Sequence, residues 1–170
     1  MPHLISRIVF LCIVFALTAN ASEPVSENPL NKGQAAFNAG DFKSSFALWQ
    51  TEATNGNPDA QVFVGLSYAN GWGVRKNTDL ASIWYLKAAI NNHPVAQLLL
   101  GLHYIQKSGA DRAAGLQWLQ RAADAGDATA QEFLRKGRSN GWFNDIHPTE
   151  DQANKANTRL NPLALASPVY

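Results

Sequence analysis

Apolar side chains recur every three to four residues through the middle of the chain, a spacing typical of helices that pack along one face. In the first of these helices, predicted to begin near Pro58, that face carries Ala60, Val64 and Tyr68. A turn with the sequence NGWGVRKN follows at residues 70–77. The pattern predicts that this turn joins the first helix to a second one.

The second predicted helix begins behind Asn77, a residue type that caps helix N-termini. Its apolar stripe carries Ala81, Trp84 and Ala88, which predicts a packing position for Trp84. The helix is expected to end at Asn92, because asparagine tolerates the left-handed backbone that follows many helices. The two helices together form a pair.

The helix pair is repeated along the chain. Residues 59–68 align with residues 95–104 at an offset of 36, and residues 81–89 align with residues 115–123 at an offset of 34. The tripeptide NGW recurs 70 residues after its first occurrence, the sum of the two offsets. Such self-similarity indicates a solenoid, in which each helix pair buries its apolar face only against its neighbours.

This register predicts further helix boundaries. The first helix of a pair should begin again near Pro94 and near Ala128, and a second helix should begin behind Asp111 and end at Gly126. A phosphate-binding loop at residues 70–77 is the alternative to a plain turn. Such a loop follows a strand, whereas a helical pattern precedes this one, so the turn is favoured.

The two ends of the array depart from the repeat. Residues 33–42 match the turn of a degenerate first copy, and Trp49 falls in register with Tyr85. A helix without a further repeat to cover it should become polar. This is seen where Arg135, Lys136 and Arg138 correspond to Gly65, Leu66 and Tyr68. Residues 149–152 look like a capping box that opens a last, polar helix to about residue 158.

The second copy resembles the Sel-one-like repeat (SLR) family, relatives of the tetratricopeptide repeat (TPR), in its Y-x-x-G-x-G-V turn and A-x-x-W-Y-x-K-A-A helix. The matching residues are Tyr68, Gly71, Gly73, Val74, Asn77, Ala81, Trp84, Tyr85, Lys87, Ala88 and Ala89. The resemblance implies an all-α, right-handed α-solenoid of antiparallel helix pairs. It also implies an adaptor for protein complexes, in bacteria often in the cell envelope.

The expected organisation has four parts: a signal peptide at residues 1–21, a linker at 22–30, the SLR/TPR-like solenoid at 31–158 and a flexible tail at 159–170. The copies of the solenoid are expected at about 31–57, 58–93, 94–127 and 128–158.

The N-terminal segment has the parts of a secretory signal peptide. Arg7 precedes an apolar run, and the small residues Ala19 and Ala21 predict cleavage after Ala21. The run is too short to span a bilayer comfortably, although an uncleaved anchor is the alternative. We therefore expect a periplasmic or secreted protein that does not span the membrane after cleavage.

Cleavage would remove Arg7 and Cys12, the only cysteine, and leave 13 basic and 13 acidic side chains. The mature chain could then form no disulfide. Balanced charge disfavours a nucleic-acid partner, which needs a basic surface. The remaining histidines, His93, His103 and His147, lack the spacing of metal ligands, so neither a metal nor another cofactor is expected.

Ser67 lies one residue short of a G-x-S-x-G nucleophile elbow, but within a helical pattern rather than a strand-to-helix turn. No serine begins the S-x-x-K motif of penicillin-binding proteins and serine β-lactamases. We therefore predict no catalytic residue and no enzyme. The alternative is a cell-wall-related hydrolase or a protein that binds β-lactams or peptidoglycan fragments.

A solenoid presents a concave surface lined by the first helices of its pairs. The weak candidates for partner contact on that surface are Gln61, Gln97, Gln131 and His103. Trp72 and Trp142, on the two NGW turns, either contact a partner or cover helix ends, and they should lie on the same edge. The sequence thus predicts a monomeric, exported adaptor or scaffold that binds another envelope protein or a peptide.

Overall fold

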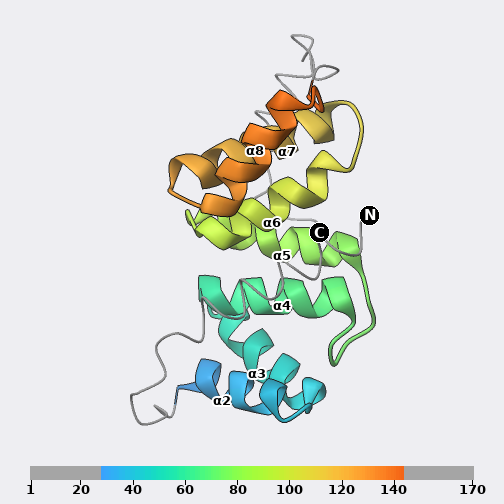
Figure 1. Cartoon of the computed structure of the whole chain (residues 1–170). Helices are drawn as coiled ribbons and strands as arrows, with labels where there is room; N and C mark the ends of the chain where they lie inside the picture. The colour runs from blue at the N-terminus through green and yellow to red at the C-terminus, as the bar shows by residue number, and fades with distance from the viewer. Residues whose placement is uncertain (1–27, 144–170) are drawn as a thin grey trace, which may run out of the picture.

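A computed structural model describes residues 28–143, which form seven α-helices and no strand. The helices are α2 (Pro29–Asn38), α3 (Phe42–Thr54), α4 (Pro58–Asn70), α5 (Thr78–Ile90), α6 (Pro94–Ile105), α7 (Ala110–Asp124) and α8 (Ala128–Ser139). Figure 1 shows them stacked in chain order from α2 to α8, each packed against its predecessor. The predicted all-α solenoid is confirmed. The signal peptide, the capping box at 149–152 and the tail lie outside the described residues.

The first helix of each pair begins where the sequence predicted. α4 and α6 begin at Pro58 and Pro94, and α8 begins at Ala128. Proline suits this position because the N–H that it lacks would have no partner in the first turn. α2 also begins on a proline, Pro29, with the side chain of Asn28 as its cap, two residues before the predicted start of the solenoid.

One predicted start of a second helix is confirmed and one is wrong. Asn77 caps α5, since its Oδ1 accepts from two backbone N–H groups at 3.0 Å each. α7, however, begins at Ala110, so Asp111 lies inside the first turn instead of capping it. The short turn before α7 reverses the chain at Gly109, whose φ of 60° is open to glycine without a steric penalty. The helix therefore starts two residues earlier than a cap at Asp111 would allow.

Both predicted ends in left-handed backbone are confirmed. Asn92, behind α5, has a φ of 59°, and Gly126, behind α7, has a φ of 93°. At both ends the left-handed residue follows the C-cap and turns the chain toward the next helix. The prediction succeeded because few residue types tolerate this conformation.

The largest core side chains come from the second helices of the pairs. Trp118 on α7 is fully buried, as predicted. Trp84 on α5 is only half-buried, and the ammonium group of Lys87 lies 4.0 Å from the centroid of its ring. The adjacent Tyr85 is 5% exposed and enters the core instead. The core position predicted for Trp84 is therefore only partly right, because α5 turns the neighbouring side chain toward α4.

Glycine on the first helix of a pair allows the second helix to approach closely. A Cβ atom at Gly65 would collide with the ring of Tyr85, and one at Gly101 would lie 2.7 Å from Cγ of Leu119. The next position in this register, on α8, is Arg135. α8 therefore offers a following helix a different surface from that of α4 or α6.

Candidate partner-binding surfaces

The three repeated glutamines make the same bond within the fold. Nε2 of Gln61 donates to the carbonyl of Ala53 at 3.2 Å, and Nε2 of Gln97 donates to the carbonyl of Ala89 at 3.3 Å. Each bond ties the start of a first helix to the end of the helix before it. Gln61 and Gln97 are only 5% and 4% exposed, which disfavours the partner contact predicted for them. A position on a first helix does not ensure that a side chain reaches the concave surface.

Gln131 differs from its two counterparts. Its Nε2 donates to the carbonyl of Ala123 at 3.0 Å, in the same pattern, but its side chain is exposed. No helix of the described residues covers α8 in the way that later helices cover α4 and α6. Gln131 therefore keeps access to solvent and stays a candidate for partner contact.

His103 lies half-buried on α6, with its ring centroid 5.8 Å from that of Tyr104. Burial lowers the pKa of His103, and the nearby charge of Lys107 lowers it further, whereas Asp79 acts in the opposite direction. The fold therefore favours the neutral imidazole, and contact by His103 stays a prediction.

His93 has a role that the sequence analysis missed. Its Nδ1 accepts from the backbone N–H of Ala96 at 3.3 Å and caps α6, while its Nε2 lies 2.8 Å from Oδ1 of Asp59 on α4. This pair of contacts places the proton on Nε2. The signal was available, because Asn57 and Asp127 hold the same capping position in the neighbouring copies. Within residues 28–143, no three His, Cys, Asp or Glu side chains gather closely enough to hold a metal ion.

Ser67 is completely buried within α4. Its Oγ donates to the carbonyl of Phe63, one helical turn earlier, at 2.8 Å. A hydroxyl that is bound to its own helix and shielded from solvent lacks the exposed setting of a nucleophile elbow.

The first NGW turn packs against the preceding helix pair. The ring centroid of Trp72 lies 5.0 Å from that of Phe37 and 6.4 Å from that of Phe42, and its side chain is half-buried. The backbone at Gly73 lies so close to the carbonyl of Phe42 that a Cβ atom would collide with it. Trp72 therefore covers the ends of α2 and α3.

The second NGW turn contacts the equivalent place in its own preceding helix pair. The carbonyl of Trp142 accepts from Nη2 of Arg112 at 2.7 Å, and Arg112 lies 70 residues after Phe42. The ring of Trp142 is 5.8 Å from that of Phe133. Both turns thus contact the start of the preceding second helix. Trp142 is nevertheless 45% exposed, so a partner could still reach it.

A groove between α7 and α8 is a surface feature that the sequence analysis did not identify. It has a volume of about 650 Å³ and is lined by two apolar residues and six polar or charged ones. The lining residues are Gln120, Ala123, Asp124, Gln131, Leu134, Arg135, Arg138 and Ser139. The change to Arg135 and Arg138 is visible in the sequence, where by itself it predicts only a polar end of the array.

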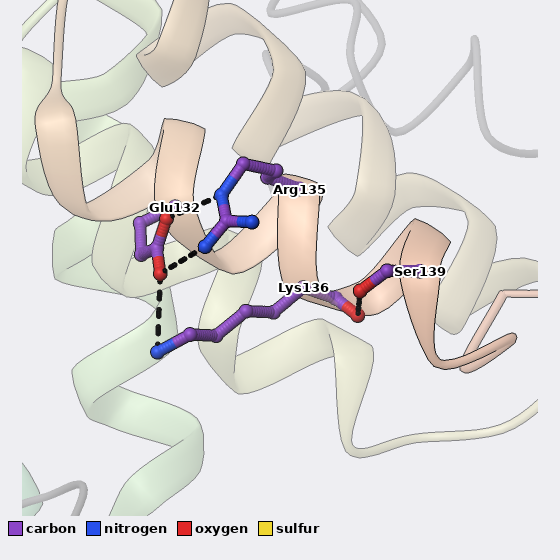
Figure 2. A network of polar contacts seen from close by, with 4 residues as sticks. All are labelled: Glu132, Arg135, Lys136 and Ser139. Atoms are coloured by element: carbon purple, nitrogen blue, oxygen red, sulfur yellow. Dashed lines mark hydrogen bonds and ion pairs between the residues drawn. The ribbon is translucent and has the colours of Figure 1, made fainter.

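Figure 2 shows the charged network on α8. Two nitrogens of Arg135, Nε and Nη2, each donate to a carboxylate oxygen of Glu132 at 2.7 Å, and Nζ of Lys136 lies 3.1 Å from Oε1 of the same carboxylate. The hydrogen bonds from Arg135 and then Lys136 lower the pKa of Glu132 to about 2. One carboxylate thus serves two cations, which leaves this helix with an excess of positive charge.

Comparison with known proteins identifies the repeat. The family model of the Sel1 repeat matches residues 58–93 and 94–127. Among solved structures, the chain is similar to a Sel1 repeat protein from Oxalobacter formigenes, with 29% identity, coverage of 64% of this chain and 86% of that chain, and a TM-score of 0.56. It is also similar to a protective antigen of uropathogenic Escherichia coli strains that displays an SLR fold, with 24% identity and a TM-score of 0.60. That match covers 80% of this chain but only 31% of the antigen, and it shows the fold alone.

No helix in the described part of the chain is both long and apolar enough to cross a membrane.

Proposed function

We propose that this chain is an exported, non-enzymatic adaptor of the bacterial cell envelope. It carries two Sel1 repeats and folds as an SLR solenoid, and such repeats suggest a protein-interaction scaffold. It acts as a monomer and binds another envelope protein or a peptide.

The observation that carries this proposal is that the repeated residues and the unrepeated residues have different roles in the structure. The repeated residues are used inside the stack, as Gln61 and Gln97 are in bonds between helices and Gly65 and Gly101 are in close helix packing. A scaffold built in this way leaves its unrepeated side chains to determine what it binds. On α8 these are arginine and lysine side chains beside a groove, a setting that suits a polar partner.

The proposed location depends on residues 1–21, which have the charged, apolar and small-residue parts of a signal peptide. Cell fractionation followed by N-terminal sequencing tests it. We expect the protein in the periplasm or medium, with Ser22 as its first residue. An intact N-terminus in the membrane fraction would favour the uncleaved anchor, and recovery from the cytoplasm would contradict export.

The adaptor function is tested by capturing partners from an envelope extract with the immobilised chain 22–170. We expect a protein or peptide that is retained reproducibly, that free chain 22–170 displaces, and that heat-unfolded chain does not retain. Failure to capture such a partner, together with reproducible turnover of peptidoglycan fragments or β-lactams by the purified chain, would favour the alternative of a cell-wall-related enzyme.

A further inference from the structure

The groove between α7 and α8 occupies a position that a tryptophan fills in the earlier copies. Trp84 packs on the cluster that contains Ala53 and Val64, and Trp118 lies in one cluster with Ala89 and Leu100. We call the space between a second helix and the following first helix a seat. The third seat has the equivalent floor, formed by Ala123 and Leu134, which line the groove but are only 8% and 2% exposed.

The wall of the third seat differs from the walls of the first two. Arg135 replaces the glycine that lets Tyr85 and Leu119 approach in the earlier copies. Its side chain is 68% exposed and remains at the surface of α8. A helix packed at the distance seen between α6 and α7 would collide with any side chain at this position. The seat therefore suits a looser ligand that can pair with a guanidinium group.

The charges of the groove favour an acidic ligand. Gln120 lies between the carboxylate and one of the cations of the groove. Its Nε2 donates to Asp124 at 2.8 Å, and its Oε1 accepts from Arg138 at 2.9 Å. In the part of the chain that the structure describes, Arg138 therefore bonds to a neutral amide and pairs with no carboxylate. Among the described residues, Arg135 pairs with the single carboxylate of Glu132, which it shares with Lys136. Both guanidinium groups have further N–H donors for a ligand.

We propose that the groove between α7 and α8 binds an acidic peptide segment of the partner protein. Carboxylates of the segment pair with Arg135 and Arg138, and one aromatic side chain enters the groove that Ala123 and Leu134 help to line. Charge-assisted pairs of arginine and carboxylate supply affinity and geometry, and the aromatic contact supplies apolar area. This inference rests on the proposed adaptor function, for which it names the face and the ligand chemistry.

The test uses the chain 22–170 and a short fluorescein-labelled synthetic peptide with one tryptophan flanked by glutamates on both sides. Fluorescence anisotropy at about 0.05 M salt should show saturable binding, which weakens at higher salt. The double variant Arg135→Gln/Arg138→Gln should weaken binding at least about tenfold, or roughly 1.4 kcal/mol. The matched control Lys32→Gln/Arg75→Gln removes two exposed cations far from the groove in sequence and should change binding less than about twofold. Circular dichroism verifies that both variants are folded.

Several results would overturn the proposal. These are no saturable binding, equal weakening by the two double variants, or equal binding of a peptide that carries glutamine in place of glutamate. Peptide binding that requires deletion of residues 144–170 would assign the groove to the chain itself. Equal competition by vesicles of anionic phospholipid would indicate a general polyanion surface.

The inference and the adaptor function can fail separately. If Arg135→Gln/Arg138→Gln captures the same envelope partner as the unmodified chain, the groove is not the binding face, although the adaptor function stands. If only the unmodified chain captures it, both are supported.

Discussion

The seat between α5 and α6 and the seat between α7 and α8 are built from the same repeat positions but have different contents. In the seat between α5 and α6, Trp118 lies fully buried in one cluster with Leu100. In the seat between α7 and α8, Leu134 is also buried, at 2% exposed, but it lies at a groove that Arg135 lines as well. The apolar floor is thus common to both, and the residue at the edge of the floor differs. One repeat unit can therefore form core where a helix follows closely, and an exposed, charged surface where arginine replaces glycine at the edge.

The largest expected effect concerns the filled seat. Trp118→Ala should lower the free energy of unfolding by about 3–5 kcal/mol, because it leaves a cavity in a fully buried site. Trp84→Ala should cost only about half as much, because Trp84 is half-buried and its ring already faces Lys87. Urea melts measure both. Equal losses would mean that the two tryptophans occupy equivalent core positions after all.

The second prediction compares the edge residues of the two seats. Gly101→Ala should destabilise the chain by about 1–3 kcal/mol, because its Cβ would lie 2.7 Å from Cγ and 2.9 Å from the backbone nitrogen of Leu119. This loss should appear although alanine favours a helix over glycine by about 1 kcal/mol. Arg135→Ala is the matched change on α8 and should stay within about 0.5 kcal/mol. A stabilising Gly101→Ala would show that α6 and α7 are not held at this distance.

The sequence was sufficient for the architecture because the repeat fixes several residue types in one register. The starts at Pro58, Pro94 and Ala128 and the left-handed residues Asn92 and Gly126 follow from local backbone chemistry. Such features depend on few neighbours, so they can be predicted from the residues alone.

Side-chain environments were harder to predict because they depend on packing between copies. Trp84 and Tyr85 are adjacent on α5, and the packing of the Tyr85 ring against Gly65 of α4 decides which of them enters the core. Gln61 and Gln97 are polar, yet they lie inside because backbone carbonyls of the preceding helices accept their N–H groups. The groove was missed because it joins α7 and α8 through residues that no local motif connects.

The third prediction compares the contributions to stability of Gln97, on α6, and Gln131, on α8. Gln97→Ala should cost about 1–2 kcal/mol, since it removes a buried hydrogen bond to the carbonyl of Ala89, which then keeps the bond from the backbone N–H of Asn92. Gln131→Ala removes the same bond at an exposed site, where water can replace it, and should cost less than about 0.5 kcal/mol. Thermal melts of the two variants provide the measurement. A larger loss for Gln131→Ala would mean that α8 depends on this bond more than α6 does.

The smallest expected effects are changes of stability with pH, one from a residue inside the array and one from a residue at its end. His103, on α6, has a lowered pKa because it is partly buried. The unfolded chain therefore takes up the proton more readily than the folded chain. The stability that the neutral ring contributes is present above its ordinary pKa of 6.5 and is lost as the pH falls through the lowered value.

Glu132, on α8, reports a lower window. Its pKa is lowered from 4.5 to about 2 by Arg135 and Lys136, so its contribution is present above pH 4.5 and is lost as the pH falls toward 2. We expect His103→Asn to reduce the loss of stability that the unmodified chain shows as the pH falls from 7 to below 6.5. Glu132→Gln should reduce only the loss of stability below pH 4.5. Because Glu132 is exposed, its small effect should also shrink in high salt, whereas that of His103 should persist. Urea melts over this pH range at low and high salt test both claims. A salt-insensitive Glu132 effect would contradict the open, solvated surface on which the comparison of the two seats rests.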